Sequence, residues 1–176
     1  MDGKKDVFYM QKALRQAQIA LKKNEVPVGA VIVNKDGQVI GRGYNKVEKL
    51  KCQTGHAEII AIKKACKKLK DWRLEDCWIY VTLEPCLMCL GLIKLSRIKG
   101  LVFGSCSNEF GFGYKNIKVC NFYKKNLIIK QGLKEVESIK LLKNFFKKLR
   151  LNRKVKGEAE KTVLRKGRKE IVTKKS

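Results

Sequence analysis

The sequence predicts an α/β fold built around a mixed sheet, and two patterns lead to this prediction. In the first part of the chain, β-rich segments at 28–34 and 39–44 flank Asp36-Gly37, a pair typical of the turn of an antiparallel hairpin. In the second part, short strand-like segments at 78–82, 99–103 and 127–130 alternate with helical segments, which indicates parallel strands. We therefore expect five strands in both orientations.

The helices are predicted from apolar residues that recur at helical spacing. We expect helices over 6–23, capped by Asp6, over 56–70, over 85–96, beginning at Pro85, and over 133–149. The side chains expected to be buried on the second helix are Ile59, Ile60, Ile62, Ala65, Cys66 and Leu69. Residues 45–55 are predicted to form a loop, and 104–116 are not assigned.

The length of 176 residues fits one domain with a sizeable core. We expect this domain to span 1–150 and a basic, mobile tail to follow at 151–176. No apolar run approaches the length of a membrane span, and the amphipathic N-terminus is unlike a signal peptide. Seven cysteines without a disulfide-framework spacing favour a reducing compartment, so we expect a cytoplasmic protein without a membrane partner.

The chain is strongly basic, with 41 lysines and arginines against 16 acidic residues and a net charge of +25. Such a surplus favours a polyanionic partner, and nucleic acid first among them. The tail at 150–176 has 11 basic and 3 acidic residues, so +17 remains on 1–149. Lysine makes up 33 of the basic residues, however, and the composition of an AT-rich genome would produce the same bias.

One histidine and two cysteines form a candidate metal site. His56 is the only histidine, and Cys86 and Cys89 follow Pro85 at a spacing of three. One imidazole and two thiolates suit a single Zn²⁺ per chain, and three protein ligands leave a fourth position for water, as in catalytic sites. Glu58, two residues after His56, is the candidate proton carrier between this water, a ring nitrogen and the leaving ammonia.

Each motif has a simpler explanation when taken alone. A lone histidine at a helix start is often a cap or a surface residue, and C-x-x-C also occurs in structural zinc sites and redox pairs. Together and in this order, H-x-E and P-C-x-x-C are the signature of the zinc nucleobase deaminases. We interpret Glu84, which directly precedes Pro85, as structural.

The chain resembles the bacterial-type tRNA-specific adenosine deaminases of the cytidine deaminase-like superfamily. The resemblance covers about 6–150 and rests on these stretches: Glu25-Val26-Pro27-Val28-Gly29-Ala30, Gly43-Tyr44-Asn45, His56-Ala57-Glu58-Ile59, Tyr80-Val81-Thr82-Leu83-Glu84-Pro85-Cys86, Met88-Cys89, Ser96-Arg97-Ile98 and Val102-Phe103-Gly104.

The resemblance implies a three-layer α/β/α sandwich around a mixed five-stranded sheet, and a homodimer. It implies zinc-dependent hydrolytic deamination of adenosine to inosine at the wobble position of a tRNA anticodon. It also implies that Asn45 contacts the target base and that Phe145 and Phe146, at the end of the last helix, meet the anticodon loop.

The chain departs from the family in the segment after Phe103-Gly104. Ser107 stands where the family usually has an acidic residue, and three aromatic residues follow: Phe110, Phe112 and Tyr114. Aromatic side chains in such a loop suit stacking on bases, but Phe110 and Phe112 would equally suit the core or a dimer interface.

Three functions remain open on the sequence alone. The first is editing of a tRNA adenosine. The second is deamination of free cytosine, guanine or a nucleotide by the same zinc site, which requires no basic surface. The third is a non-catalytic, zinc-stabilised RNA-binding module, and Glu58 argues against it because a structural site does not need the H-x-E triplet.

Overall fold

The structure, a computed structural model, describes residues 3–113 and 127–152. The chain divides into two compact units, Met1–Leu142 and Lys143–Ser176, and each is described by itself. The sheet and the predicted metal ligands belong to the first unit. The boundary predicted at 150/151, and the mobility of the tail beyond it, remain predictions.

Five strands form one mixed sheet in the order β2-β1-β3-β4-β5. β1 pairs antiparallel with both β2 and β3, whereas β3 and β4, and β4 and β5, are parallel. The strands span Gly29–Val33 (β1), Val39–Tyr44 (β2), Trp78–Leu83 (β3), Gly100–Ser105 (β4) and Ile128–Lys130 (β5). The five predicted strands and the mixture of orientations are confirmed.

The turn between β1 and β2 has the chemistry that the Asp-Gly pair predicted. Gly37 has a φ of 78°, in the left-handed region that glycine tolerates best. The amide of Gly37 donates to the carbonyl oxygen of Asn34 at 3.0 Å, and the amide of Gln38 donates to Oδ1 of Asn34 at 2.8 Å. These bonds fix the register of the hairpin.

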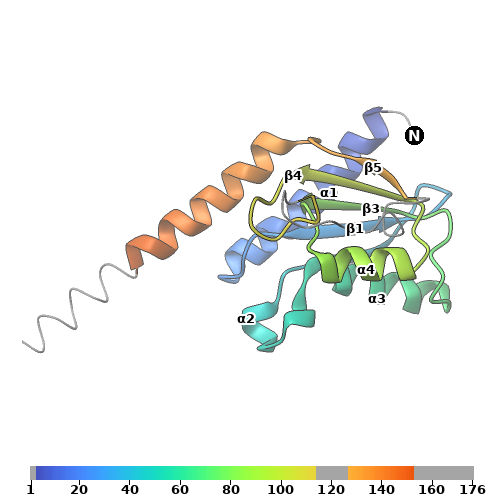
Figure 1. Cartoon of the computed structure of the whole chain (residues 1–176), viewed down its shortest axis with the longest axis horizontal. Coiled ribbons are helices and arrows are strands. Elements are labelled where there is room, and N and C mark those ends of the chain that lie inside the picture. The colour runs from blue at the N-terminus through green and yellow to red at the C-terminus, as the bar shows by residue number, and fades with distance from the viewer. Residues whose placement is uncertain (1–2, 114–126, 153–176) are drawn as a thin grey trace, which may run out of the picture. The chain divides into compact units, whose positions relative to one another are not determined.

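Helices cover both faces of the sheet (Figure 1). One face packs against α1 (Gly3–Lys22), and the other packs against α3 (Ala57–Leu69) and α4 (Leu87–Leu95). Each face has its own buried cluster: one includes Met10, Val31, Trp78, Tyr80 and Val102, and the other Ile32, Ala61, Ile79, Leu90 and Phe103. The three-layer α/β/α sandwich is confirmed.

The buried face of α3 agrees with the prediction only in part, at Ile62 and Ala65. Small residues face the sheet, namely Ala57, Ala61 and Ala65, whereas Ile59, Ile60 and Cys66 are partly exposed and Leu69 is exposed. The reason lies in β2, where a Cβ on Gly41 or Gly43 would collide with the carbonyl oxygen of Ala61 or Ala57. Glycine on the strand and alanine on the helix let the two backbones approach closely, which sets the position of the helix that begins after His56.

The prediction that Asp6 caps the first helix is wrong. The helix begins at Gly3, and Asp6 is buried within its first turn. The carboxylate of Asp6 accepts hydrogen bonds from the hydroxyl of Tyr80 and from Nζ of Lys130, each at 2.7 Å. Burial, and next the bond to Asp6, raise the pKa of Tyr80. Asp6 therefore ties α1 to two strands.

The last predicted helix is found at 135–152, with 135–142 in the first unit. Ser138 is buried, and a Cβ on Gly104 would collide with its hydroxyl oxygen, so the first turn of the helix lies close against β4. No helix among the described residues is long and apolar enough to cross a membrane. The six cysteines in the described part of the chain are all free, and Cys120 lies outside that part.

Candidate metal and catalytic site

His56 ends an ordered segment that sequence analysis predicted as a loop. Residues 45–55 contain the short helix α2 (Val47–Leu50) and the 3₁₀ turn η1 (Gln53–Gly55). The amide of Lys46 donates to the carbonyl oxygen of Gly55 at 2.8 Å and closes the segment at its base. His56 then takes an extended conformation as the N-cap residue of α3, as predicted for the start of that helix.

Cys86 and Cys89 lie at the start of α4 (Leu87–Leu95), the helix that follows β3. The helix begins at Leu87 with Cys86 as its N-cap residue, so the prediction that Pro85 begins the helix is wrong. Pro85 and Cys86 pair instead with the segment after β4. The amide of Phe112 donates to the carbonyl oxygen of Pro85 at 3.1 Å, and Cys86 forms an antiparallel bridge with Gly111.

The structure brings the three predicted metal ligands together. Nδ1 of His56 lies 3.7 Å from Sγ of Cys86 and 3.4 Å from Sγ of Cys89. The ligand atoms of the three residues all lie within 4.8 Å of one another. Bond lengths typical of tetrahedral zinc would place such nitrogen and sulfur atoms about 3.6 Å apart. The donor set and its spacing therefore fit Zn²⁺. Cys89 is buried, whereas His56 and Cys86 are half-buried, so the group is accessible from one side.

Hydrogen bonds within this group shift the pKa of each of the three residues. A hydrogen bond from the Cys89 thiol, and next the bond to His56, lower the pKa of Cys86 to about 4. The hydrogen bond between the two cysteines raises the pKa of Cys89. The hydrogen bond between His56 and Cys86 raises the pKa of His56. Zinc binding requires both cysteines as thiolates and a neutral imidazole, so a bound ion would take the place of the protons that these atoms share.

Glu58 lies beside this group and is buried, with 4% of its surface exposed. Burial raises the pKa of its carboxyl group, while its own backbone amide, the charge of His56 and a hydrogen bond with Cys89 act in the opposite direction. Glu58 and His56 are thus held together by the first turn of α3, and Glu58 adjoins the thiol of Cys89. The arrangement places one carboxyl group next to the three candidate metal ligands.

Asn45, the predicted contact to the target base, is buried where β2 leads into the segment before His56. Its backbone amide donates to the carbonyl oxygen of Val28 at 3.0 Å, and its side-chain Nδ2 donates to the carboxylate of Glu25 at 3.4 Å. Sequence analysis assigned no role to Glu25. The signal available was an acidic residue between two apolar segments, at the start of a stretch shared with the family.

Glu84 has the structural role that sequence analysis expected. Its carboxylate is buried and accepts hydrogen bonds from the backbone amides of Ser107, at 2.9 Å, and Gly113, at 2.8 Å. A Cβ on Gly111 would collide with this carboxylate, so glycine is required there. Glu84 therefore holds the segment 105–113 against the residues that flank Cys86.

The aromatic residues of this segment have different environments. Phe112 belongs to the core and packs edge-on against Phe103, with ring centroids 5.9 Å apart. Phe110 is 70% exposed, and its neighbour Gly111 pairs with Cys86. Tyr114 lies outside the described residues. The core explanation thus holds for Phe112, whereas stacking and dimer contact both remain open for Phe110.

Phe145 and Phe146, the other predicted substrate contacts, belong to the second unit. Their rings pack edge to face with centroids 5.2 Å apart. Phe145 is buried and Phe146 is 43% exposed. Phe146 is therefore the more accessible of the two.

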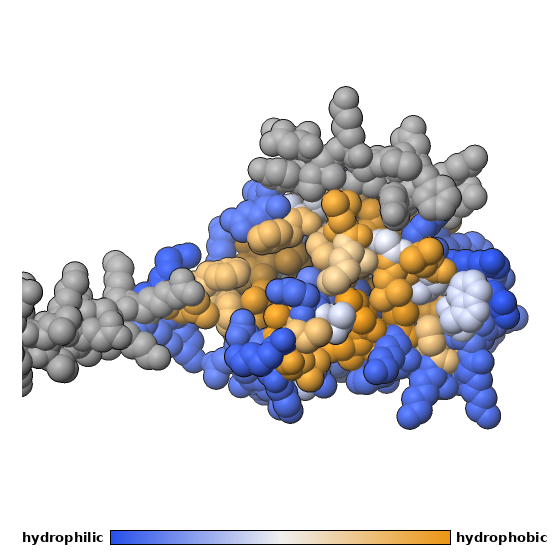
Figure 2. Space-filling view, turned by 60° about the horizontal axis from the view of Figure 1, so that its bottom comes forward, coloured by the Kyte–Doolittle hydropathy of each residue, from blue (hydrophilic) through white to orange (hydrophobic). Residues whose placement is uncertain are grey.

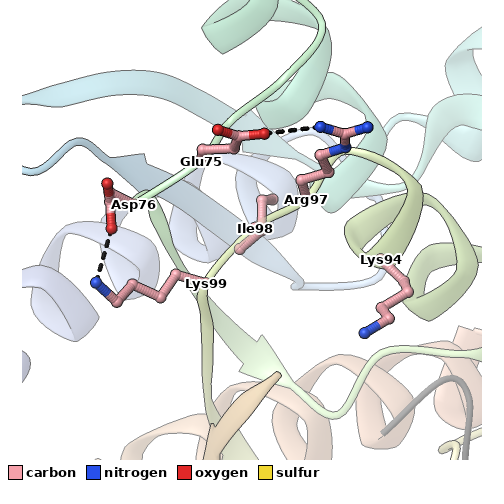
Figure 3. A pocket seen from close by; sticks show the side chains of 6 residues that line it. All are labelled: Glu75, Asp76, Lys94, Arg97, Ile98 and Lys99. Atoms are coloured by element: carbon pink, nitrogen blue, oxygen red, sulfur yellow. Dashed lines mark hydrogen bonds and ion pairs between the residues drawn. The ribbon is translucent and has the colours of Figure 1, made fainter. Parts of the chain in front are cut away.

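A hollow of about 460 Å³ lies where the chain enters β3 and β4 (Figure 3). Its lining comes from residues that precede β3 and β4, whereas Cys86 follows β3. Two exposed ion pairs line it, Glu75 with Arg97 at 2.9 Å and Asp76 with Lys99 at 2.7 Å. None of the predicted site residues borders this hollow, so we do not assign the chemistry to it.

Comparisons with known proteins show the family of the chain. The model of one family, described as MafB19-like deaminase, matches residues 4–150. The tRNA-specific adenosine deaminase of Aquifex aeolicus (strain VF5) is 42% identical over 146 residues, covering 82% of this chain and 96% of that protein. That of Rickettsia bellii (strain RML369-C) is 45% identical over 147 residues, covering 80% and 99%. A solved structure from a study of A-to-I editing by tRNA:A34 deaminases at the wobble position is 37% identical, with a TM-score of 0.70, and covers 77% of this chain and 99% of that one.

Proposed function

Because this chain belongs to the family of MafB19-like deaminases, we propose that it converts adenosine to inosine at the wobble position of a tRNA anticodon. The observation that carries the proposal is similarity along almost the entire length of relatives named tRNA-specific adenosine deaminases. Membership of a deaminase family favours an enzyme over a non-catalytic RNA-binding module. We also propose that it acts in the cytoplasm, on the ground that tRNA is its substrate.

In this proposal His56, Cys86 and Cys89 hold one zinc ion per chain. Their donor atoms are of the types that zinc prefers, and their spacing fits tetrahedral coordination. When bound, zinc supplies activation of the water that attacks the base. The half-buried side of the ligand group, at His56 and Cys86, is where a base and a water would enter.

Glu58 moves the proton. The oxygen of water forms a bond to the adenine carbon that bears the amino group, and Glu58 takes a proton from the water and passes it to the neighbouring ring nitrogen. Glu58 then takes the second proton, from the hydroxyl group now bonded to that carbon, and gives it to the amino nitrogen. The bond between the carbon and the amino nitrogen breaks, ammonia leaves, and the carbonyl group of inosine forms. The burial of Glu58 beside Cys89 supports this role, because the carboxyl group lies next to the metal ligands and away from bulk water.

We propose Asn45, Phe145 and Phe146 as contacts to the substrate. Asn45 is buried next to the segment that leads to His56, so its amide is held in place for hydrogen bonds to a base. Phe146 is exposed enough to stack on a base of the anticodon loop, and Phe145 supports its ring edge to face. Loop nucleotides suit such a pocket because they cost less to extrude than paired ones.

We also propose that the protein is a homodimer that associates through α4. This helix exposes Leu87, Met88 and Leu95, and Figure 2 shows apolar side chains gathered on the face that α3 and α4 cover. A second copy of the chain could bury this surface on both subunits at once. Sedimentation of the wild type and of Leu95→Glu would test this, since a wild type that stays monomeric at micromolar concentration contradicts it.

The test of the function is to incubate the zinc-loaded protein with total tRNA and to sequence the tRNA for inosine. Inosine should appear at the first anticodon position of one or a few tRNAs, and the Glu58→Ala protein should produce none. Free cytosine, cytidine and guanine should show negligible turnover in parallel assays. Turnover of a free base or nucleoside without inosine in tRNA would refute the RNA substrate and leave the deaminase chemistry standing.

A further inference from the structure

Glu25 is a buried carboxylate for which the proposed reaction has no direct use. It lies between α1 and β1 with 1% of its surface exposed. Its backbone amide donates to the carbonyl oxygen of Ala20 at 3.0 Å, which fixes the residue to the end of α1. A carboxylate buried this deeply is retained only where several donors compensate for its lost hydration.

Three donors satisfy this carboxylate, and all three come from residues 45–49. Nδ2 of Asn45 donates to Oε2 at 3.4 Å, the amide of Glu48 donates to Oε2 at 3.0 Å, and the amide of Lys49 donates to Oε1 at 2.8 Å. The two amides belong to the first turn of α2, and the N-cap residue Lys46 makes no side-chain bond to that turn. Glu25 therefore serves as the missing cap from more than 20 positions away in the sequence.

Because α2 is short, its stability depends on this contact. The helix has four residues, too few to be stable by itself, because nucleation fixes several residues for one hydrogen bond. The carboxylate thus holds the start of α2 and the amide of Asn45 at one point. It takes one of the two Nδ2 hydrogens, which leaves Oδ1 and the second hydrogen of Asn45 for a ligand.

The position of His56 has separate support. The bond from the amide of Lys46 to the carbonyl oxygen of Gly55 closes the segment directly before His56 without Glu25. Gly55 is packed so tightly that a Cβ would lie 2.8 Å from the backbone of Lys46 and Val47. Removal of the Glu25 carboxylate should therefore release Asn45 while the metal ligands keep their places.

We propose that Glu25 is a positioning residue for substrate binding, which acts through Asn45. It orients the Asn45 amide toward the base and holds the α2 turn beside it. The inference rests on the proposed function, and it adds a residue that touches neither the metal ligands nor the reacting atoms. If the carboxylate were purely structural, its removal would lower the stability of the fold and leave the affinity for substrate unchanged.

The test compares Glu25→Ala and Glu25→Gln with a matched control, Asp6→Asn. Asp6 is also a buried carboxylate with two donors, but its partners Tyr80 and Lys130 link α1 to the strands and lie outside the segment 45–55. Zinc content, melting temperature, kcat and KM would be measured on an anticodon stem-loop of the tRNA that the wild type edits.

We expect Glu25→Ala to lower kcat/KM at least tenfold, mainly through KM, with one zinc per chain retained. Glu25→Gln, which keeps one acceptor oxygen, should lie between this variant and the wild type. Asp6→Asn should melt at a lower temperature with kcat/KM within about twofold of the wild type. Because Glu25 acts through Asn45, the double variant Glu25→Ala/Asn45→Ala should be no worse than Asn45→Ala alone.

Two results would overturn the role of Glu25: a kcat/KM for Glu25→Ala within twofold of the wild type, or a loss of zinc that accounts for the lost activity. Fully additive losses in the double variant would overturn the route through Asn45. The wild type serves as the separate test of the function. If it forms no inosine in any tRNA, the proposed function fails, and the role of Glu25 in binding that substrate fails with it.

Discussion

Replacement of Glu84 by alanine would release the segment 105–113 from its anchor beside the metal ligands. The carboxylate is 8% exposed and accepts two backbone hydrogen bonds, from Ser107 and from Gly113. Bonds to a charged acceptor contribute about 1.5–3 kcal/mol each. Since other bonds, such as that from Phe112 to Pro85, still hold part of the segment, we expect the lower end. The free energy of unfolding should fall by about 3 kcal/mol.

The assay is urea unfolding of the zinc-loaded protein, with thermal melting as a second measure. A loss of about 3 kcal/mol corresponds to a fall of about 6–12 °C in the melting temperature for a chain of this size. Glu48→Ala is the matched control, because the side chain of Glu48 is 70% exposed and its ion pair with Lys51, at 3.6 Å, is weak. This control should stay within about 0.5 kcal/mol of the wild type.

Two outcomes would refute the reasoning on Glu84. A loss below about 1 kcal/mol would mean that the two backbone bonds are replaced by water without cost. Loss of zinc from the size-conserving variant Glu84→Gln would mean that the carboxylate acts on the metal ligands and not on the segment. Gly111→Ala should reproduce much of the destabilisation, because its Cβ would displace the same carboxylate.

Four further predictions concern the metal, the core, the exposed aromatic residue and the tail. Cys86→Ala should lose zinc and stability together, whereas Glu58→Ala should keep zinc and fold and lose turnover by several orders of magnitude; elemental analysis with a kinetic assay separates the two. Ser138→Ala should raise the free energy of unfolding by about 1 kcal/mol, because the hydroxyl is buried without a hydrogen-bond partner among the described residues; a loss above 1 kcal/mol would reveal a partner. If Phe110 stacks on a base, Phe110→Trp should keep kcat/KM and Phe110→Leu should lower it several-fold without a change in oligomeric state; dissociation in Phe110→Leu would favour a dimer contact instead. Deletion of 153–176 should leave the melting temperature almost unchanged and make the salt dependence of RNA affinity shallower, and a large drop in melting temperature would contradict this.

The sequence by itself predicted which residues form the candidate site. One histidine, two cysteines at a spacing of three and a glutamate after the histidine indicated a His/Cys/Cys group, and the structure brings these three residues together, because the donor types and their local spacing are written in the sequence. It also determined the strands and their mixed orientation, because alternating β-rich and helical segments constrain how neighbouring strands connect. The Asp36-Gly37 turn was predictable because glycine tolerates the left-handed backbone conformation that the turn requires.

The tertiary structure decided what depends on contacts between distant parts of the chain. The buried face of α3 follows from Gly41 and Gly43 on a neighbouring strand, so the periodicity of the helix alone identified Ile62 and Ala65 but missed Ala57 and Ala61. Pro85 lies outside α4, and its carbonyl oxygen accepts a bond from the amide of Phe112, 27 positions later in the chain. Glu25 and Glu84 each satisfy backbone amides more than 20 positions away. No local pattern encodes such pairs, because a carboxylate finds its donors only once the fold has brought them together and removed the water between them.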